Sequence, residues 1–271
     1  MIDTDNRTGP WMQMSRGQPF WPLDIRPHDI HIEDIAHQLS LENRFSGAVL
    51  VPYSVAEHSV RVAHYVRDRA IALGWTGEKL RNVVFAALMH DIEEGTGWRD
   101  MARPVKYWDG MAEYRHESKR SKLKIFEILG VDYNPEVQAL VKEGDNTLLA
   151  TEKRDVMAPS LLEWEPMPDP LETRVDPYYW SEARDMFLEM YYEYQPGGPD
   201  REAMARVRES INLSKQFWDY QISALGASVD ALREIQGMVL GHKGGSGIPI
   251  AKILEAIRAL KEREAAASSS P

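Results

Sequence analysis

An apolar run that ends in a histidine and an aspartate constrains the fold of this chain most strongly. The segment FAALM at 85–89 leads directly into His90 and Asp91, with Glu93 and Glu94 just behind. Burying an imidazole beside a carboxylate is costly unless another group pairs with them. We therefore expect other segments of the chain to direct partners toward this pair.

Helical periodicity dominates the sequence and predicts an all-α fold, because no segment alternates convincingly as a strand would. Ser54 with Glu57 three residues later predicts a capping box at one helix start. Gly130 and Pro135 indicate the end of one helix and the first turn of the next. The expected helices lie at 29–42, 54–73, 77–91, 112–130, 134–157 and 176–194.

The segment QPGGPD at 195–200 marks the predicted domain boundary. It separates a domain at 1–195 from a C-terminal helical extension at 196–271, which ends in a low-complexity tail. Within the extension we expect a helical segment over about 201–240, a flexible segment at 241–247 and a short helix at 249–263. An apolar stripe fits docking on the domain or on a neighbouring subunit; its members are Met204, Val207, Ile211, Phe217 and Ile222.

Composition excludes several classes of protein. The formal net charge of −10 at pH 7 disfavours binding to long nucleic acid. No apolar run approaches the roughly 18 residues of a membrane span, and the first residues lack the pattern of a signal peptide. We therefore expect a cytoplasmic protein without a membrane partner. Because cysteine is absent, any metal must be held by histidines and carboxylates.

Four polar residues, His58, His90, Asp91 and Asp145, share helix faces with apolar residues and are expected to point into the interior. A single buried histidine is more often a hydrogen-bonded core residue than a ligand, and a lone buried aspartate more often links two helices. Four such groups converging would be an expensive core without a cation. They are a suitable ligand set for a divalent metal.

An ordered set of motifs resembles the HD-domain phosphohydrolases. NRFSG at 43–47 and YSVAEHS at 53–59 are similar to the Arg-aromatic and Ser-x-x-Glu-His-Ser segments of small 5'-deoxynucleotidases and phage dNTP triphosphohydrolases. LMHDIEEGTGWRDMARPVK at 88–106 is similar to their His-Asp and Pro-Val-Lys stretch, and VKEGDNTLLATEKRD at 141–155 supplies the distal aspartate. The resemblance extends over about 20–195 and implies an HD-domain helical bundle, close to the phage branch that includes dATP triphosphohydrolases.

The resemblance also implies the roles of the site residues. His58, His90, Asp91 and Asp145 would hold one metal, for which Zn, Mn, Co, Ni or Fe are suitable, with Mg as an optional second ion. Glu94 would activate or hold the attacking water, whereas Glu93 is expected to point to solvent. Asp100 would contact the sugar 3'-hydroxyl or a second, phosphate-bridging metal.

Three further residues match substrate-binding positions of these enzymes. Arg44 and Lys106 would bind the phosphates, and the alternative for each is a surface salt bridge. Phe45 would pack on the base or the sugar, and the alternative is ordinary core packing.

The expected function is that of a metal-dependent phosphohydrolase of deoxynucleotides. A dNTP (dATP) triphosphohydrolase that releases deoxynucleoside and triphosphate is favoured. The alternatives are a 5'-deoxynucleotidase acting on dNMPs, or a non-catalytic metal-binding regulatory module. The resemblance further implies a homo-oligomer, from dimer to hexamer, in the host cytoplasm if the protein is phage-encoded.

Overall fold

The computed structural model describes residues 6–213 and 216 of the 271-residue chain. The chain divides into two compact units, Met1–Ile211 and Asn212–Pro271. Apart from residues 212 and 213, the features described below belong to the first unit. Phe217 and Ile222, the segment at 241–247 and the helix expected at 249–263 lie outside the described residues.

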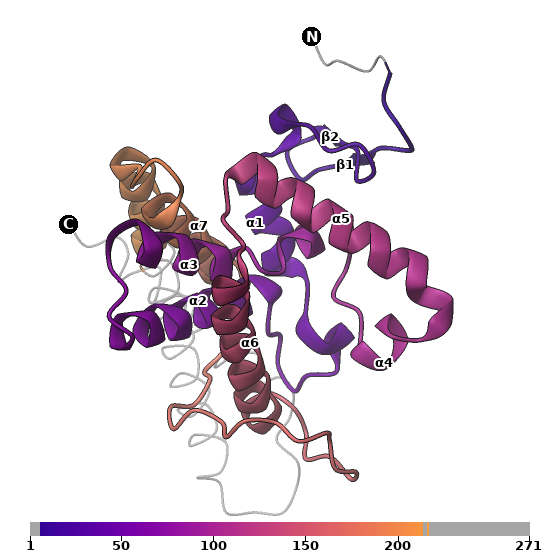
Figure 1. Cartoon of the computed structure of the whole chain (residues 1–271), viewed down its shortest axis with the longest axis vertical. Coiled ribbons are helices and arrows are strands. Elements are labelled where there is room, and N and C mark those ends of the chain that lie inside the picture. Colours follow the sequence, from indigo (N-terminus) through magenta and orange to yellow (C-terminus); the bar gives the residue numbers. More distant parts are fainter. Residues whose placement is uncertain (1–5, 214–215, 217–271) are drawn as a thin grey trace, which may run out of the picture. The chain divides into compact units, whose positions relative to one another are not determined.

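Helices make up nearly all the regular structure of the described residues, which confirms the all-α prediction (Figure 1). The strands β1 (Met12–Gln13) and β2 (Pro19–Phe20) form one small antiparallel hairpin. The longer helices are α1 (Ile32–Leu41), α2 (Val55–Ala72), α3 (Gly77–Leu88), α5 (Ala112–Leu129), α6 (Pro135–Asp155) and α7 (Trp180–Tyr194). Shorter turns are η1 (Pro27–Asp29), η2 (Arg44–Gly47), η3 (Ile92–Thr96), α4 (Arg103–Lys106) and η4 (Asp109–Met111).

The helix ends largely follow the predicted signals. Gly130 caps α5 in the left-handed conformation (φ 72°), and Pro135 is the first residue of α6. Ser54 caps α2 by accepting a hydrogen bond from the backbone N–H of Glu57. The reciprocal half of the capping box was predicted wrongly: the Glu57 carboxylate instead accepts hydrogen bonds from Arg61 and from the backbone N–H of Tyr178.

The main core lies around α2, which packs against α3, α6 and α7, while α1 packs against α7. Gly144 of α6 faces Val62, Tyr65 and Val66 of α2. A Cβ at this glycine would lie 2.9 Å from Cγ2 of Val66 and 3.1 Å from Cδ1 of Tyr65. The absence of a side chain at residue 144 therefore sets how closely α6 can approach α2.

The end of α3 differs from the prediction, because the helix stops at Leu88 and does not include His90 and Asp91. The chain turns there into the 3-10 helix η3, which packs against α1. A Cβ at Gly95 of η3 would lie 2.8 Å from Cγ of Leu39 and 3.0 Å from the carbonyl oxygen of Ile35. Residue 95 can pack this closely against α1 because it is a glycine and because the chain leaves the axis of α3 after Leu88.

A helical stretch at 201–213 follows α7. Its Met204 and Val207 are buried, and Val207 belongs to the main core, against which Ile211 packs. The predicted division into a domain at 1–195 and an extension remains a prediction; the first compact unit ends at Ile211.

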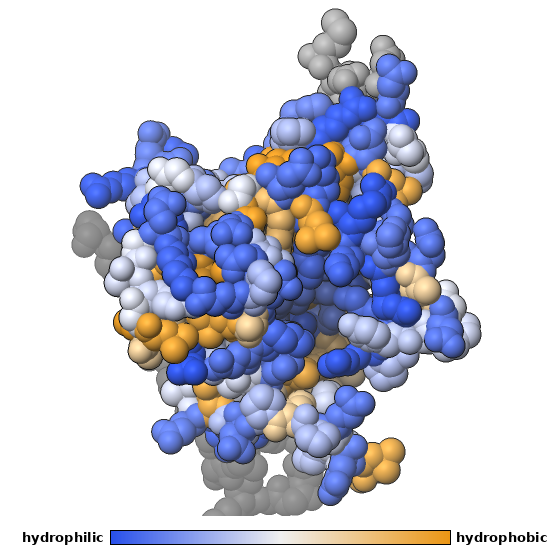
Figure 2. Space-filling model, viewed as in Figure 1, coloured by the Kyte–Doolittle hydropathy of each residue, from blue (hydrophilic) through white to orange (hydrophobic). Residues whose placement is uncertain are grey.

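The surface in view is mostly hydrophilic, with apolar residues gathered in small separate patches (Figure 2). Among the described residues, every helix is too short or too polar to serve as a membrane span.

Candidate metal centre

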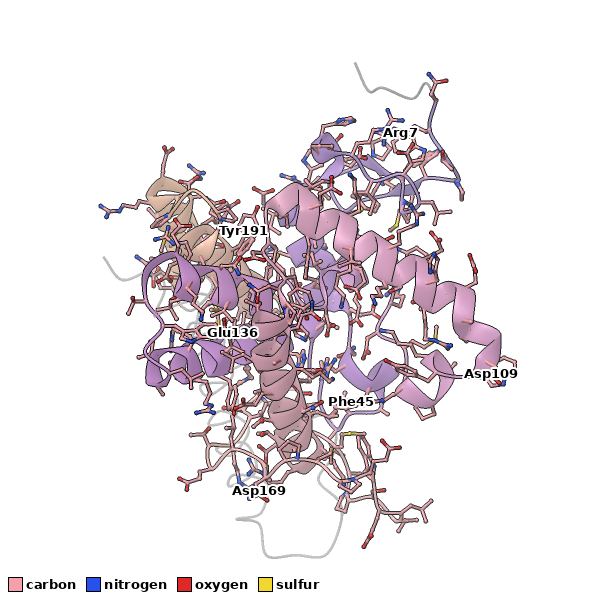
Figure 3. All side chains as sticks on the ribbon, in the orientation of Figure 1. Arg7, Phe45, Asp109, Glu136, Asp169 and Tyr191 are labelled. Atoms are coloured by element: carbon pink, nitrogen blue, oxygen red, sulfur yellow. The ribbon has the colours of Figure 1, made fainter. Side chains whose placement is uncertain are left out.

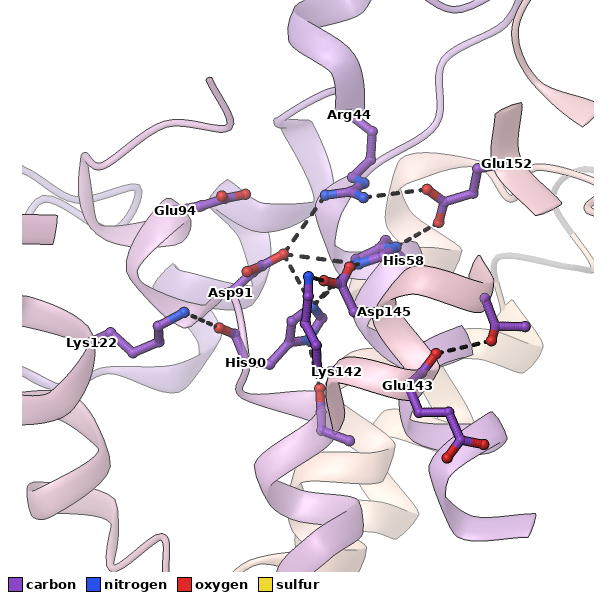
Figure 4. A network of polar contacts seen from close by, with 12 residues as sticks. Arg44, His58, His90, Asp91, Glu94, Lys122, Lys142, Glu143, Asp145 and Glu152 are labelled. Carbon is purple, nitrogen blue, oxygen red and sulfur yellow. Dashed lines mark hydrogen bonds and ion pairs between the residues drawn. The ribbon is translucent and has the colours of Figure 1, made fainter. Parts of the chain in front are cut away.

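The structure brings the four predicted metal ligands together from three segments of the chain (Figure 4). His58 lies on α2, His90 and Asp91 lie in the turn after α3, and Asp145 lies on α6. Ligand atoms of His58, His90 and Asp145 all lie within 4.8 Å of one another. The two Nε2 atoms are 3.2 Å apart, and Oδ1 of Asp145 is 3.4 Å from Nε2 of His58. Oδ2 of Asp91 is 3.2 Å from Nε2 of His90 and 3.9 Å from that of His58.

The second ring nitrogen of each histidine faces an acceptor. Nδ1 of His90 lies 2.8 Å from the carbonyl oxygen of Ala87, and Nδ1 of His58 lies 2.5 Å from Oε1 of Glu152. Because these oxygens accept hydrogen bonds, each Nδ1 carries a hydrogen. A neutral imidazole then has its lone pair at Nε2, which in both residues points into the cluster. Both rings are therefore oriented as metal ligands.

The electrostatics of the cluster favour a positive charge among the carboxylates. Burial and the guanidinium of Arg44 lower the pKa of His58, but Glu152 and Asp145 outweigh them and raise it to about 9. Burial raises the pKa of Asp145, yet the hydrogen bond from His58 and the charge of His90 outweigh burial and hold it well below its usual range. A divalent cation would supply the positive charge that this arrangement favours.

The donor set fits such a cation. It consists of imidazole nitrogens and carboxylate oxygens, which suit Zn, Mn, Co, Ni or Fe. Three buried carboxylate oxygens near the cluster have no hydrogen-bond partner in the described part of the chain: Oε2 of Glu93, Oε2 of Glu94 and Oδ2 of Asp100. Buried charged atoms of this kind are costly unless a ligand or ion satisfies them. His58, His90, Asp145 and Asp91 are therefore the residues that could hold a metal.

Glu94 and Glu93 have different surroundings, and the expectation that Glu93 points to solvent was wrong. Both side chains are buried. Glu93 lies 3.3 Å from Nζ of Lys122. Burial and the charges of Asp91 and Asp100 raise the pKa of Glu94 well above its usual value. The three-residue repeat of the 3-10 helix η3 explains why Glu94 lies near Asp91.

Two basic residues border the acidic cluster. Nη1 of Arg44 is 3.7 Å from Oδ2 of Asp91, and Nη2 is 3.3 Å from Oε2 of Glu152. Nζ of Lys106 lies 3.6 Å from Oε1 of Glu94. Arg44 is buried, so the alternative of a surface salt bridge does not apply to it.

The loop that carries Arg44 is strained. Phe45 and Ser46 both have left-handed backbone angles (φ 58° and 52°), which are unfavourable for residues with a side chain. Oγ of Ser46 donates to the carbonyl oxygen of Asp100 and accepts from the backbone N–H of Ala102. These bonds connect the loop of Arg44 to the segment that carries Asp100.

Phe45 packs against the cluster formed by Tyr53, Val156 and Val175, near the end of α6 (Figure 3). Its ring meets that of Trp164 edge-on, with centroids 6.4 Å apart. Phe45 is half-buried and Trp164 is 37% exposed. Phe45 therefore makes ordinary core contacts, the alternative to packing on a base or sugar, and part of its ring stays exposed to solvent.

Comparisons with known proteins place this cluster in a family. The model of the HD domain matches residues 55–155, a range that includes all four candidate ligands. The uncharacterized protein YfdR of Escherichia coli is 32% identical over 140 residues, which cover 52% of this chain and 68% of YfdR. The chain belongs to the HD-domain family.

A second relative is more similar to this chain over a shorter region. An uncharacterized protein of Rhodobacter capsulatus is 42% identical over 98 residues, which cover 35% of this chain and 46% of that protein. The matched region thus spans less than half of the Rhodobacter protein. The HD domain indicates a metal-dependent hydrolase and supports the general class of metal-dependent phosphohydrolases.

Several residues of the HD-domain site were missed in the sequence. Glu152 accepts hydrogen bonds from His58 and Tyr53, and Lys142 donates to Oδ2 of Asp145 at 2.7 Å. Lys122 donates to the carbonyl oxygen of His90. Glu152 follows Asp145 by seven residues, which is two helical turns, so helical spacing alone could have placed it on the same face. No sequence signal distinguishes Lys122 or Lys142 from the other lysines of their helices.

Proposed function

We propose that this HD-domain protein is a metal-dependent phosphohydrolase of deoxynucleotides, and specifically a dNTP triphosphohydrolase with dATP as the favoured substrate. The products would be deoxynucleoside and triphosphate. The observation that carries the proposal is the convergence of two imidazoles and two carboxylates beside a buried arginine and a buried, unpaired glutamate oxygen.

The reaction is the addition of water across one phosphoester bond. The water oxygen bonds to the α-phosphorus, the bond from that phosphorus to the 5'-oxygen breaks, and the 5'-oxygen takes up a proton. His58, His90, Asp91 and Asp145 would hold a divalent cation, which would supply Lewis acidity toward the attacking water and a phosphoryl oxygen.

The remaining roles belong to the protein. Glu94 accepts a proton from the attacking water or holds that water in line; its Oε2 has no hydrogen-bond partner in the described residues. Arg44 and Lys106 balance the charge of the phosphates. Asp100 contacts the sugar 3'-hydroxyl or a second cation, and Phe45 packs on the base or sugar.

A substrate screen tests the proposal. Each dNTP and dNMP is incubated with the full-length protein and with Zn, Mn, Co, Ni or Mg, and triphosphate and orthophosphate are measured separately. We expect triphosphate from dATP. Asp91→Ala removes a candidate metal ligand and its charge, so it should lower the rate by more than the about 10–100-fold that follows loss of a partner of a ligand. A circular dichroism spectrum checks that the variant folds.

The other outcomes assign other functions. Orthophosphate released from dNMPs, without triphosphate from dNTPs, would identify a 5'-deoxynucleotidase. A folded, metal-loaded protein that turns over no nucleotide would identify a non-catalytic metal-binding module.

We also propose that the protein is a homo-oligomer, between dimer and hexamer, that acts in the cytoplasm. Light scattering coupled to size-exclusion chromatography tests the first point, and a monomer across the micromolar range would contradict it.

A further inference from the structure

Glu152 is the buried carboxylate closest to the imidazole of His58. Its side chain is inaccessible to solvent, although it lies on α6 two turns from Asp145. Oε1 accepts hydrogen bonds from Nδ1 of His58 (2.5 Å) and from the hydroxyl of Tyr53 (2.8 Å). Oε2 accepts a hydrogen bond from Nη2 of Arg44 (3.3 Å). Both oxygens of this carboxylate are therefore engaged.

Packing alone does not account for a glutamate at this position. A buried charge must be compensated by well-placed donors, and an apolar residue of similar volume would fill the same space without that cost. The three donors that compensate Glu152 are not equivalent. One is a candidate metal ligand, one is the arginine beside Asp91, and the third is a tyrosine from the segment between them in sequence.

We propose that Glu152 is a positioning residue of the metal centre, which holds the His58 ring with Nε2 directed at the cation and increases the donor strength of that nitrogen. A carboxylate that accepts the other N–H of a ligating histidine has this effect in metal sites generally. The inference rests on the metal site of the proposed function.

The two histidines differ in what holds them. His90 is oriented by the carbonyl of Ala87, a backbone group of its own turn. His58 depends on a side chain 94 residues away in the sequence. Only the partner of His58 can therefore be removed by substitution, and His90 serves as an internal control.

The test compares Glu152→Gln with Glu143→Gln in the full-length protein. Glu143 lies on the same helix, is directed away from the imidazoles (Figure 4), and pairs with Tyr65 and Arg69. The dissociation constants for Mn²⁺ and Zn²⁺ are measured by calorimetry on protein stripped of metal. We expect Glu152→Gln to weaken binding by about 10–100-fold, and Glu143→Gln to leave it unchanged.

A second readout separates positioning from general stability. In ¹⁵N spectra, the ring signals of His58 should shift in Glu152→Gln, whereas those of His90 should stay in place. A purely structural role would lower the unfolding temperature without this selectivity. If Glu152→Gln does not fold, Tyr53→Phe takes its place; it removes one hydrogen bond to Oε1 and should weaken metal binding less, in the same direction.

A folded Glu152→Gln protein with wild-type metal affinity and an unshifted His58 would overturn the inference. The same holds for Tyr53→Phe with wild-type affinity where Glu152→Gln cannot be studied. Neither measurement requires turnover. A protein that binds metal but hydrolyses no nucleotide would therefore contradict only the proposed function.

Discussion

The carboxylates around His58 and His90 differ in the groups that they contact, and these contacts suggest a different role for each carboxylate. Asp145 and Asp91 lie within 4 Å of imidazole nitrogens, whereas Glu152 accepts the hydrogen on the far side of a ring. Glu93 is paired with Lys122. Glu93 and Glu94 each have one buried oxygen without a hydrogen-bond partner in the described residues and a lysine beside the other oxygen. The charges that act on Glu94 include Asp91 and Asp100 of the candidate site, which is why the proposed function gives proton transfer to Glu94 and leaves charge compensation to Glu93.

Replacing Glu94 by Gln tests this assignment. The amide has the same shape but cannot accept a proton from water, so kcat should fall by about 10²–10⁴-fold. Metal affinity should stay near that of the wild type, because the candidate ligands are unchanged. Steady-state kinetics and calorimetry measure the two effects. The exposed Glu127→Gln of α5 is the control, and an unchanged kcat in Glu94→Gln would refute the role.

At the scale of secondary-structure elements, the site depends on how closely α6 approaches α2. These two helices carry Asp145 and His58, and the residue next to Asp145 is Gly144. A methyl group there would collide with Val66. The residue that allows the helices to approach is thus adjacent to a ligand, and both belong to the same turn of α6.

We expect Gly144→Ala to destabilise the protein, with overpacking that costs about 1–3 kcal/mol and a gain in helix propensity of about 1 kcal/mol as a partial offset. Val66→Ala opens the space that the new methyl group needs. The loss of unfolding free energy in the double variant should therefore be smaller than the sum of the losses in the two single variants, by about 0.5–3 kcal/mol. Urea denaturation measures each value. Strict additivity would show that the two residues do not limit the helix approach.

The sequence predicted the helices and the four candidate ligands from the helical period of the apolar residues. His58 and Asp145 do lie on helices, whereas His90 and Asp91 lie in the turn after α3. The sequence did not predict that α3 ends at Leu88, since the close packing of Gly95 against α1 is a tertiary contact. It also placed Glu93 in solvent, although Lys122 of a distant helix covers it. Helical spacing could have placed Glu152 on the face of Asp145. Its hydrogen bonds could not be predicted, because its partners His58 and Arg44 lie 94 and 108 residues away in the sequence.

At the scale of the whole molecule, the candidate centre connects three segments of one compact unit: α2, the turn after α3, and α6. A cation bound there would interact with all three. Ligands that bind the native state and not the unfolded chain stabilise the native state by mass action. The metal should therefore act on global stability as well as on catalysis.

Metal addition should raise the unfolding temperature. At a free metal concentration of 100 times the dissociation constant, the gain is about 2.7 kcal/mol, or about 5–10 °C for a domain of this size. EDTA should reverse the effect, and Asp145→Asn should show less of it because a ligand charge is lost. Differential scanning fluorimetry provides the measurement. An unfolding temperature that is insensitive to metal and EDTA would argue against a bound cation.

His90 is held by a group close to it in sequence and His58 by a distant one, and this difference affects when the metal centre can form during synthesis of the chain. The partner of His90 is made three residues before it, so this half of the centre can form while the nascent chain is still short. The partner of His58 emerges from the ribosome 94 residues later, and such long-range contacts form late in folding. A chain would then bind the ion tightly only after α6 has been synthesised and has packed against α2. A fragment that stops before residue 152 should bind the ion only weakly.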